Sequence, residues 1–182
     1  SFNYDFPTTQ QKGITLLKGR DNKVKVYSWD TNLGGTMHFF AAAIQVKDSD
    51  STKTTWYEVE NAEIDEYIPS YTAIDMIEQD DKTIYLLSYR YIVSNKQVID
   101  GVEAYSIQGG VLKPHPVFKI KSEKAKTHIE RTYDIFEEDE FRYYVTYDST
   151  SKSVLEVLTD EFEKPIERMR VYSWHNGFFI EK

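Results

Sequence analysis

The sequence predicts an all-β fold of antiparallel hairpins arranged as a sandwich or open barrel, with a small or incomplete β-propeller as the alternative. Two observations predict it. Apolar and polar side chains alternate with a period of two, and turn-forming residues separate the alternating segments. The composition agrees, because the chain contains 14 Tyr, 10 Phe and 3 Trp, which are residue types that fit a pleated, half-buried surface.

Two segments give the strand pattern most clearly. Residues 141–147 alternate strictly, and the face that we expect to point inward carries Phe141, Tyr143, Val145 and Tyr147. Residues 84–93 are apolar at nearly every position, which is typical of a central strand covered on both faces. A helix is the rival interpretation there, but the Tyr, Ile and Val residues favour a strand. The same core is expected to contain Leu86, Phe118 and Ile120.

Turn chemistry marks three hairpin connections, at residues 80–83, 108–110 and 148–152, and the end of a strand at residues 94–97. A helix is compatible with the sequence only at 159–168, where Pro165 would interrupt it, and at 122–130, where the apolar stripe is thin. No linker or change in composition divides the 182 residues. We therefore expect one domain, residues 1–182, large enough to bury roughly 70% of its unfolded surface.

The charge excludes several partners. The chain carries 22 Lys and Arg against 30 Asp and Glu, giving a formal net charge of −8. A nucleic-acid partner is not expected, because polyanions require a basic face. No apolar run approaches the ~20 residues that a membrane-spanning helix needs. The absence of cysteine excludes disulfides and thiol chemistry.

Motifs for catalysis or cofactors are missing from the sequence. It contains no Gly-x-Ser-x-Gly, no phosphate-binding glycine loop and no His-Glu-x-x-His, so neither a cofactor nor a metal is expected. Asp48–Ser51 begins like a calcium loop, but Lys53 stands where the loop needs glycine. Asp30–Gly34 fails similarly, and both segments are better explained as Asx turns. A carboxylate pair for hydrolysis stays open, because 30 acidic residues supply many pairs, and its catalytic residues are unknown.

A short repeat suggests a ligand site. Tyr27-Ser28-Trp29 recurs as Tyr172-Ser173-Trp174, with a weaker copy at residues 104–107, and each copy precedes a turn. We expect the first two strands to share a sheet or lie on facing sheets, with both tryptophans in one cluster. Amphipathic rings beside polar turn residues suit sugars and peptides. The candidate ligand-binding residues are therefore Trp29, Asp30, Trp174 and His175; the alternative is that the tryptophans cap the core.

Three segments resemble uncharacterised exported or lipoprotein-type β-rich proteins of Gram-negative gut bacteria: Thr83–Leu87, Val102–Ile107 with its Gly-Gly turn, and Tyr172–Phe179. The resemblance implies a periplasmic or cell-surface location and no particular activity. The chain opens with Ser1, which is compatible with a removed leader or a lipid anchor upstream.

Two functions follow from these observations. The first is a non-catalytic exported binding or accessory domain for a carbohydrate, a peptide or a partner protein. The alternative is a hydrolase that uses a pair of carboxylates, as glycosidases do.

Overall fold

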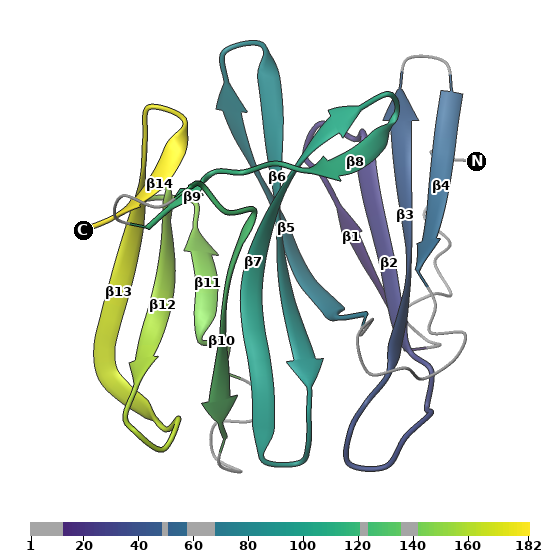
Figure 1. Ribbon diagram of the computed structural model, residues 1–182. Helices are drawn as coiled ribbons and strands as arrows, with labels where there is room; N and C mark the ends of the chain where they lie inside the picture. Colours follow the sequence, from purple (N-terminus) through teal and green to yellow (C-terminus); the bar gives the residue numbers. More distant parts are fainter. Residues whose placement is uncertain (1–12, 49–50, 58–67, 121–123, 136–141) are drawn as a thin grey trace.

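The computed structural model describes residues 13–48, 51–57, 68–120, 124–135 and 142–182. This part of the chain forms fourteen strands and no helix, which confirms the all-β prediction. The strands form three separate sheets that stand side by side in a sandwich-like stack, and no closed barrel is formed (Figure 1). Every pairing is antiparallel except that of β14 with β9.

Sheet A is a meander in which each strand pairs with the next along the chain, in the order β1-β2-β3-β4. It contains β1 (Ile14–Lys18), β2 (Val24–Asp30), β3 (Phe40–Asp48) and β4 (Ser51–Tyr57). The side chains of Val26 and Ile44 are paired neighbours on the face that points to the middle sheet.

Sheet B lies in the middle, in the order β10-β7-β6-β5, with β8 pairing the end of β7. Its strands are β5 (Ser70–Gln79), β6 (Lys82–Ile92), β7 (Gln97–Gln108), β8 (Val111–Pro114) and β10 (His128–Asp134). Sheet C has the order β11-β12-β13-β14-β9. It contains β9 (Phe118–Lys119), β11 (Val145–Asp148), β12 (Ser153–Thr159), β13 (Pro165–His175) and β14 (Phe178–Glu181).

The middle sheet packs on both sides, as the apolar run at residues 84–93 predicts. Ile84 and Leu86 belong to the core shared with sheet C, whereas Tyr85 and Leu87 belong to the core shared with sheet A. Alternate residues of one strand therefore serve two cores, and this explains why β6 has no polar face. Phe118 is fully buried in the core next to sheet C, and Ile120 packs against it, as predicted.

All three predicted hairpin connections are present, because Gln79 pairs with Lys82, Gln108 with Val111 and Asp148 with Ser153. The strand end predicted near residues 94–97 is also present, since β6 ends at Ile92 and a short connection leads to its partner β7. Asp80 has a φ of 49°, a left-handed conformation that aspartate tolerates in tight turns.

Neither segment considered for a helix forms one in the residues that the structure describes, 159–168 and 124–130. Thr159 ends β12 and Pro165 begins β13, so the proline lies at a strand start, where its missing N–H is tolerated. His128 begins β10, so the second segment ends in a strand as well.

The face predicted for residues 141–147 is partly wrong. Val145 is buried and Tyr147 packs against the core, but Tyr143 is 46% exposed and Tyr144 is fully buried in its place. The strand begins only at Val145, and Tyr144 lies in a bend before it. Asp100 Oδ2 accepts the backbone N–H of Tyr144 at 2.8 Å, which fixes this bend. Phe141 lies outside the described residues.

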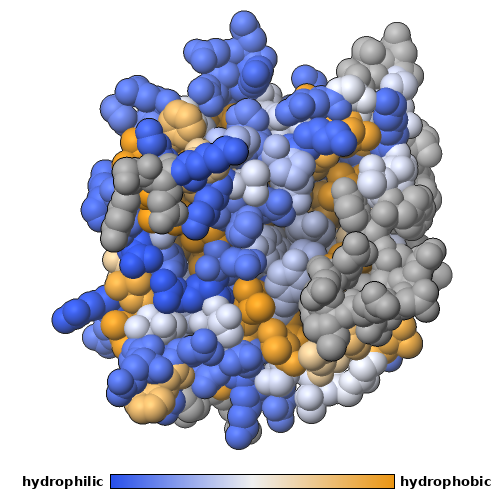
Figure 2. Space-filling view, in the orientation of Figure 1, coloured by the Kyte–Doolittle hydropathy of each residue, from blue (hydrophilic) through white to orange (hydrophobic). Residues whose placement is uncertain are grey.

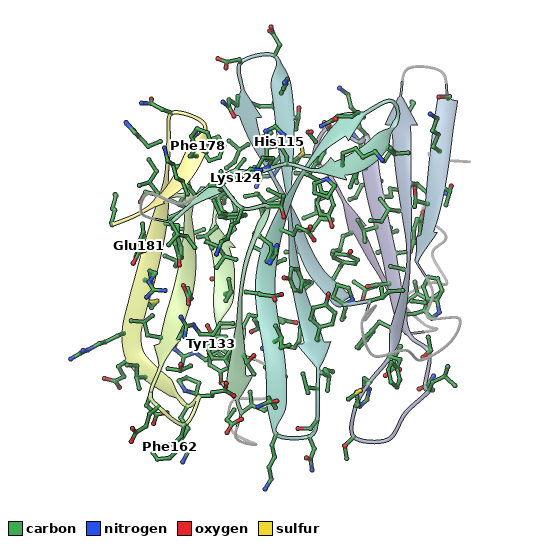
Figure 3. All side chains as sticks on the ribbon, viewed as in Figure 1. His115, Lys124, Tyr133, Phe162, Phe178 and Glu181 are labelled. Carbon is green, nitrogen blue, oxygen red and sulfur yellow. The ribbon has the colours of Figure 1, made fainter. Side chains whose placement is uncertain are left out.

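Two buried ion networks join sheets B and C. Arg90 donates to both carboxylate oxygens of Asp100, at 2.6 and 2.8 Å, and also to the carbonyl of Arg142. Glu156 of β12, 2% exposed, accepts hydrogen bonds from Arg131, Arg170 and the Tyr172 hydroxyl. The ring of Tyr133, which is labelled in Figure 3, stacks on Tyr144 with ring centroids 4.5 Å apart. Both carboxylates are buried and paired with arginines, as stable burial of charge requires, although Arg131 and Arg170 still reach solvent.

Candidate functional site

The structure does not bring the four predicted ligand-binding residues together. Trp29 lies in β2 of sheet A and Trp174 in β13 of sheet C, with sheet B between them (Figure 1). The predicted tryptophan cluster is therefore wrong, because similar hairpins were built into different sheets. Trp174 packs edge-to-face on Phe179, with ring centroids 4.9 Å apart, and caps the core between sheets B and C.

Asp30 and His175 are the last residues of β2 and β13, next to their tryptophans. Asp30 Oδ1 accepts the N–H of Asn32 at 2.8 Å, which is the Asx turn that the sequence predicts. Its Oδ2 lies 2.6 Å from His38 Nδ1. His175 is exposed, and its ring nitrogen lies 3.1 Å from the Asn176 amide. Ligand binding at either place stays a prediction, and neither place combines the four residues.

A different constellation lies on the side of sheet B that faces sheet A. Strand register places four rows of side chains across β6, β7 and β10, among them Leu87–Glu103–His128, Tyr89–Gly101–Glu130 and Tyr91–Ile99–Thr132. The fourth row pairs Tyr85 with Tyr105. We name the polar and aromatic part of this surface the tyrosine–glutamate face: Tyr89, Tyr91, Glu103, Tyr105 and Glu130.

Hydrogen bonds fix both carboxylates of this face. The Tyr105 hydroxyl donates to Glu103 at 2.6 Å, and the Tyr89 hydroxyl donates to Glu130 at 2.6 Å. Tyr89 reaches Glu130 across the intervening strand because its row partner is Gly101, which has no side chain. A Cβ at Gly101 would lie 2.3 Å from Cζ of Tyr89, so only glycine leaves room for this ring. Tyr91 completes the arrangement with an edge-to-face contact to Tyr89, centroids 5.4 Å apart.

The electrostatics of the face follow from partial burial. Burial raises the pKa of Glu103 above its usual value, and the nearby Glu130 adds to this, whereas the Tyr105 hydrogen bond and His128 oppose it. Burial, followed by repulsion from Glu130 and Glu103, raises the pKa of Tyr91 to about 12. Burial and the bond to Glu130 raise the pKa of Tyr89 as well. The five groups thus act on one another as a single cluster, with both tyrosines neutral at physiological pH.

Part of this face is open. Sheet A contacts sheet B mainly through β5 and β8. The strands β7 and β10 are therefore less covered by sheet A. Glu130 and His128 are exposed, whereas Tyr91, Glu103 and Tyr105 are half-buried. Figure 2 shows a hollow with pale atoms, of intermediate hydropathy, over β6 and β7 beside sheet A. Aromatic rings and hydrogen-bonding groups in a recess are the usual elements of a ligand site.

Within the described residues, no group of three or more His, Asp or Glu side chains is arranged to hold a metal ion. The tyrosine–glutamate face therefore offers aromatic contacts, two hydrogen-bond-accepting carboxylates and two negative charges. The Asp48–Ser51 segment considered for calcium falls partly outside the described residues.

Sequence reasoning missed this face, although part of its signal was visible. Alternate tyrosines at 85, 89 and 91 pointed to one side of a strand, and Glu103 and Tyr105 lie at alternate positions of another. The register that sets Glu103 diagonally across from Glu130 joins strands 27 positions apart, and no local pattern specifies it.

Comparison of the chain with protein-family models, with curated proteins and with solved structures finds no match.

Proposed function

We propose that this chain is a non-catalytic binding domain whose ligand contacts the tyrosine–glutamate face. One observation carries the proposal: three tyrosines and two carboxylates share one partly open side of the middle sheet, and two of the tyrosines hold the carboxylates by direct hydrogen bonds. Rigid aromatic rings supply contact area at little entropic loss, and fixed acceptors orient the bound group. A carbohydrate, a peptide or a partner protein would each use these elements. An exported location remains part of the proposal, and fractionation of the native host with an antibody tests it.

The proposal can be tested on the full chain labelled with fluorotyrosine. Titration with neutral oligosaccharides and with peptides, followed by ¹⁹F NMR, should shift the signals of Tyr91 and Tyr105, assigned from Tyr→Phe variants. Tyr91→Ala should weaken binding about fivefold or more, as truncation of an interface tyrosine commonly does.

Tyr143→Ala is the control, because Tyr143 is a more exposed tyrosine that belongs to the segment leading into sheet C. Ligands that shift only tyrosines outside the tyrosine–glutamate face would contradict the proposal.

A carboxylate-pair hydrolase is the second candidate, and one observation favours it. Glu103 and Glu130 lie on one face, and burial raises the pKa of the first, whereas the second is exposed. In glycosidases, two neighbouring carboxyl groups lie in different environments, so that one stays protonated and acts as the acid while the other is ionised and acts as the base or nucleophile.

Turnover assays on a panel of oligosaccharides distinguish the two functions. For a hydrolase, Glu103→Gln and Glu130→Gln should each lower the rate at least a hundredfold while substrate still binds. Suppose that a sugar binds saturably but that the concentration of reducing ends stays at the level of the enzyme-free blank. That result would exclude hydrolysis of this substrate.

A further inference from the structure

The tyrosine–glutamate face concentrates negative charge with little compensation. Glu103 and Glu130 are diagonal neighbours on β7 and β10, and the described partners of both carboxylates are tyrosine hydroxyls. Among the described residues, no Lys or Arg forms an ion pair with either of them. His128, opposite Glu103 in the register, is the basic group that lowers the pKa of that carboxylate.

A cation at this position would relieve an existing strain. Burial and Glu130 both disfavour the charged form of Glu103 in the free protein. A positive group placed between the two carboxylates would favour that form and would reduce their mutual repulsion. The neighbouring ring of Tyr91, which is half-buried, adds a second attraction, since ammonium and guanidinium groups bind to the faces of aromatic rings.

The positions of Glu103 and Glu130 in the sheet suit an extended chain. Diagonal residue positions on neighbouring antiparallel strands lie roughly 7–8 Å apart along the backbone. Alternate side chains of an extended peptide are separated by about 6.6–6.8 Å along the chain. Two basic side chains at positions i and i+2 of such a peptide can therefore each reach one glutamate, and the residue between them points away.

We infer that the tyrosine–glutamate face binds an extended basic peptide through two Lys or Arg side chains at alternate positions. The inference rests on the proposed binding function and names the ligand class. The overall charge of −8 agrees with it, because an acidic protein attracts basic segments over long range.

The experiment compares two peptides that differ only in charge. The probe is acetyl-Gly-Lys-Thr-Lys-Gly-amide, and the matched peptide carries norleucine at both lysine positions. Calorimetry and ¹⁹F NMR on the fluorotyrosine-labelled chain should show at least tenfold tighter binding of the lysine peptide. Raising the salt from 0.05 to 0.5 M should weaken that binding, since the contacts are partly exposed.

Variants locate the effect. The double variant Glu103→Gln/Glu130→Gln should lose at least tenfold in affinity for the lysine peptide, and glutamine still accepts the tyrosine hydrogen bonds that support the fold. Glu167→Gln, an exposed residue of β13, should change nothing. Circular dichroism and melting temperature confirm that each variant is folded.

Two sets of results would overturn the inference, and they differ in what they leave standing. If both peptides bind equally at these tyrosines, or if only neutral or amino sugars bind there, a basic peptide is not the ligand, but the proposed binding function stands. Failure of every peptide and sugar to shift these tyrosines would remove both.

Discussion

The ring of Tyr89 lies directly on the backbone of Gly101, its partner on the next strand, so that a Cβ on Gly101 would come within 2.3 Å of the ring. This contact lets the Tyr89 hydroxyl cross β7 and reach Glu130 on β10. One glycine thereby determines whether the tyrosine–glutamate face has its observed shape.

Gly101→Ala should displace Tyr89 and lower the free energy of unfolding by roughly 1–3 kcal/mol, the usual range for overpacking a filled site. Urea unfolding measures the change. Gly35→Ala is the control, because nothing lies within 4 Å of a Cβ there. In the background Tyr89→Ala, the alanine at 101 should become nearly neutral; an undiminished effect would show that another contact is responsible.

Glu156→Gln should destabilise the contact between sheets B and C. It removes the charge that Arg131 and Arg170 both bind, and we expect a loss of about 2 kcal/mol, less than the ~3–5 kcal/mol of a fully buried pair because both arginines reach solvent. Thermal and urea unfolding check this against Glu167→Gln. Equal stability of the two variants would mean that the network adds nothing net.

Phe118→Ala tests the core between sheets B and C. Phe118 is fully buried and stacks on Phe179, with ring centroids 5.1 Å apart. Removing its ring should lower the free energy of unfolding by about 3–5 kcal/mol. Phe162→Ala is the control, since this ring is 64% exposed at the loop between β12 and β13 (Figure 3), and a change beyond about 0.5 kcal/mol there would be unexpected.

Ser28→Ala should leave stability unchanged or raise it by about 1 kcal/mol. The Ser28 hydroxyl is buried without a hydrogen-bond partner among the described residues, so its removal relieves an unsatisfied polar group. Ser153, equally buried, bonds to the Ser151 carbonyl and to Ser173, and Ser153→Ala should lose about 1 kcal/mol. The same sign for both substitutions in urea melts would contradict this contrast.

Alkali should destabilise the fold through its buried tyrosines. Burial is the first cause that raises the pKa of Tyr85, Tyr89, Tyr133 and Tyr172. Unfolded tyrosines ionise near pH 10, so above that pH the unfolded chain binds fewer protons than the folded one. Tyrosine ionisation should therefore leave the free energy of unfolding unchanged below about pH 9–10 and lower it as the pH rises further.

Absorbance at 295 nm, recorded with circular dichroism, measures this titration. The buried tyrosines should ionise only together with the loss of structure. Complete ionisation near pH 10 with the β-sheet spectrum intact would refute the expected protection.

Local chemistry explains what the sequence could predict. Turn residues such as Asp80 and the continuous apolar run of β6 depend on neighbouring positions, and so the hairpins and the doubly covered strand could be predicted. The assembly of hairpins into sheets depends on distant contacts. The repeated Tyr-Ser-Trp segment therefore indicated similar hairpins correctly but gave no information that one belongs to sheet A and the other to sheet C.

The bend at Tyr144 shows the same limit at one residue. Alternation predicted that Tyr143 points inward, but a carboxylate 44 positions away, on Asp100, holds the N–H of Tyr144 and delays the strand. The tyrosine–glutamate face likewise exists only once β10 pairs with β7, so neither glutamate could be chosen from the sequence.

Sheet B carries a core on each side, so neither outer sheet can be removed without exposing apolar surface. Fragments that stop before β11 or start after β4 would display such a surface and would tend to aggregate. The smallest unit that folds on its own should therefore comprise all three sheets. We expect them to unfold together in one cooperative transition rather than one sheet at a time.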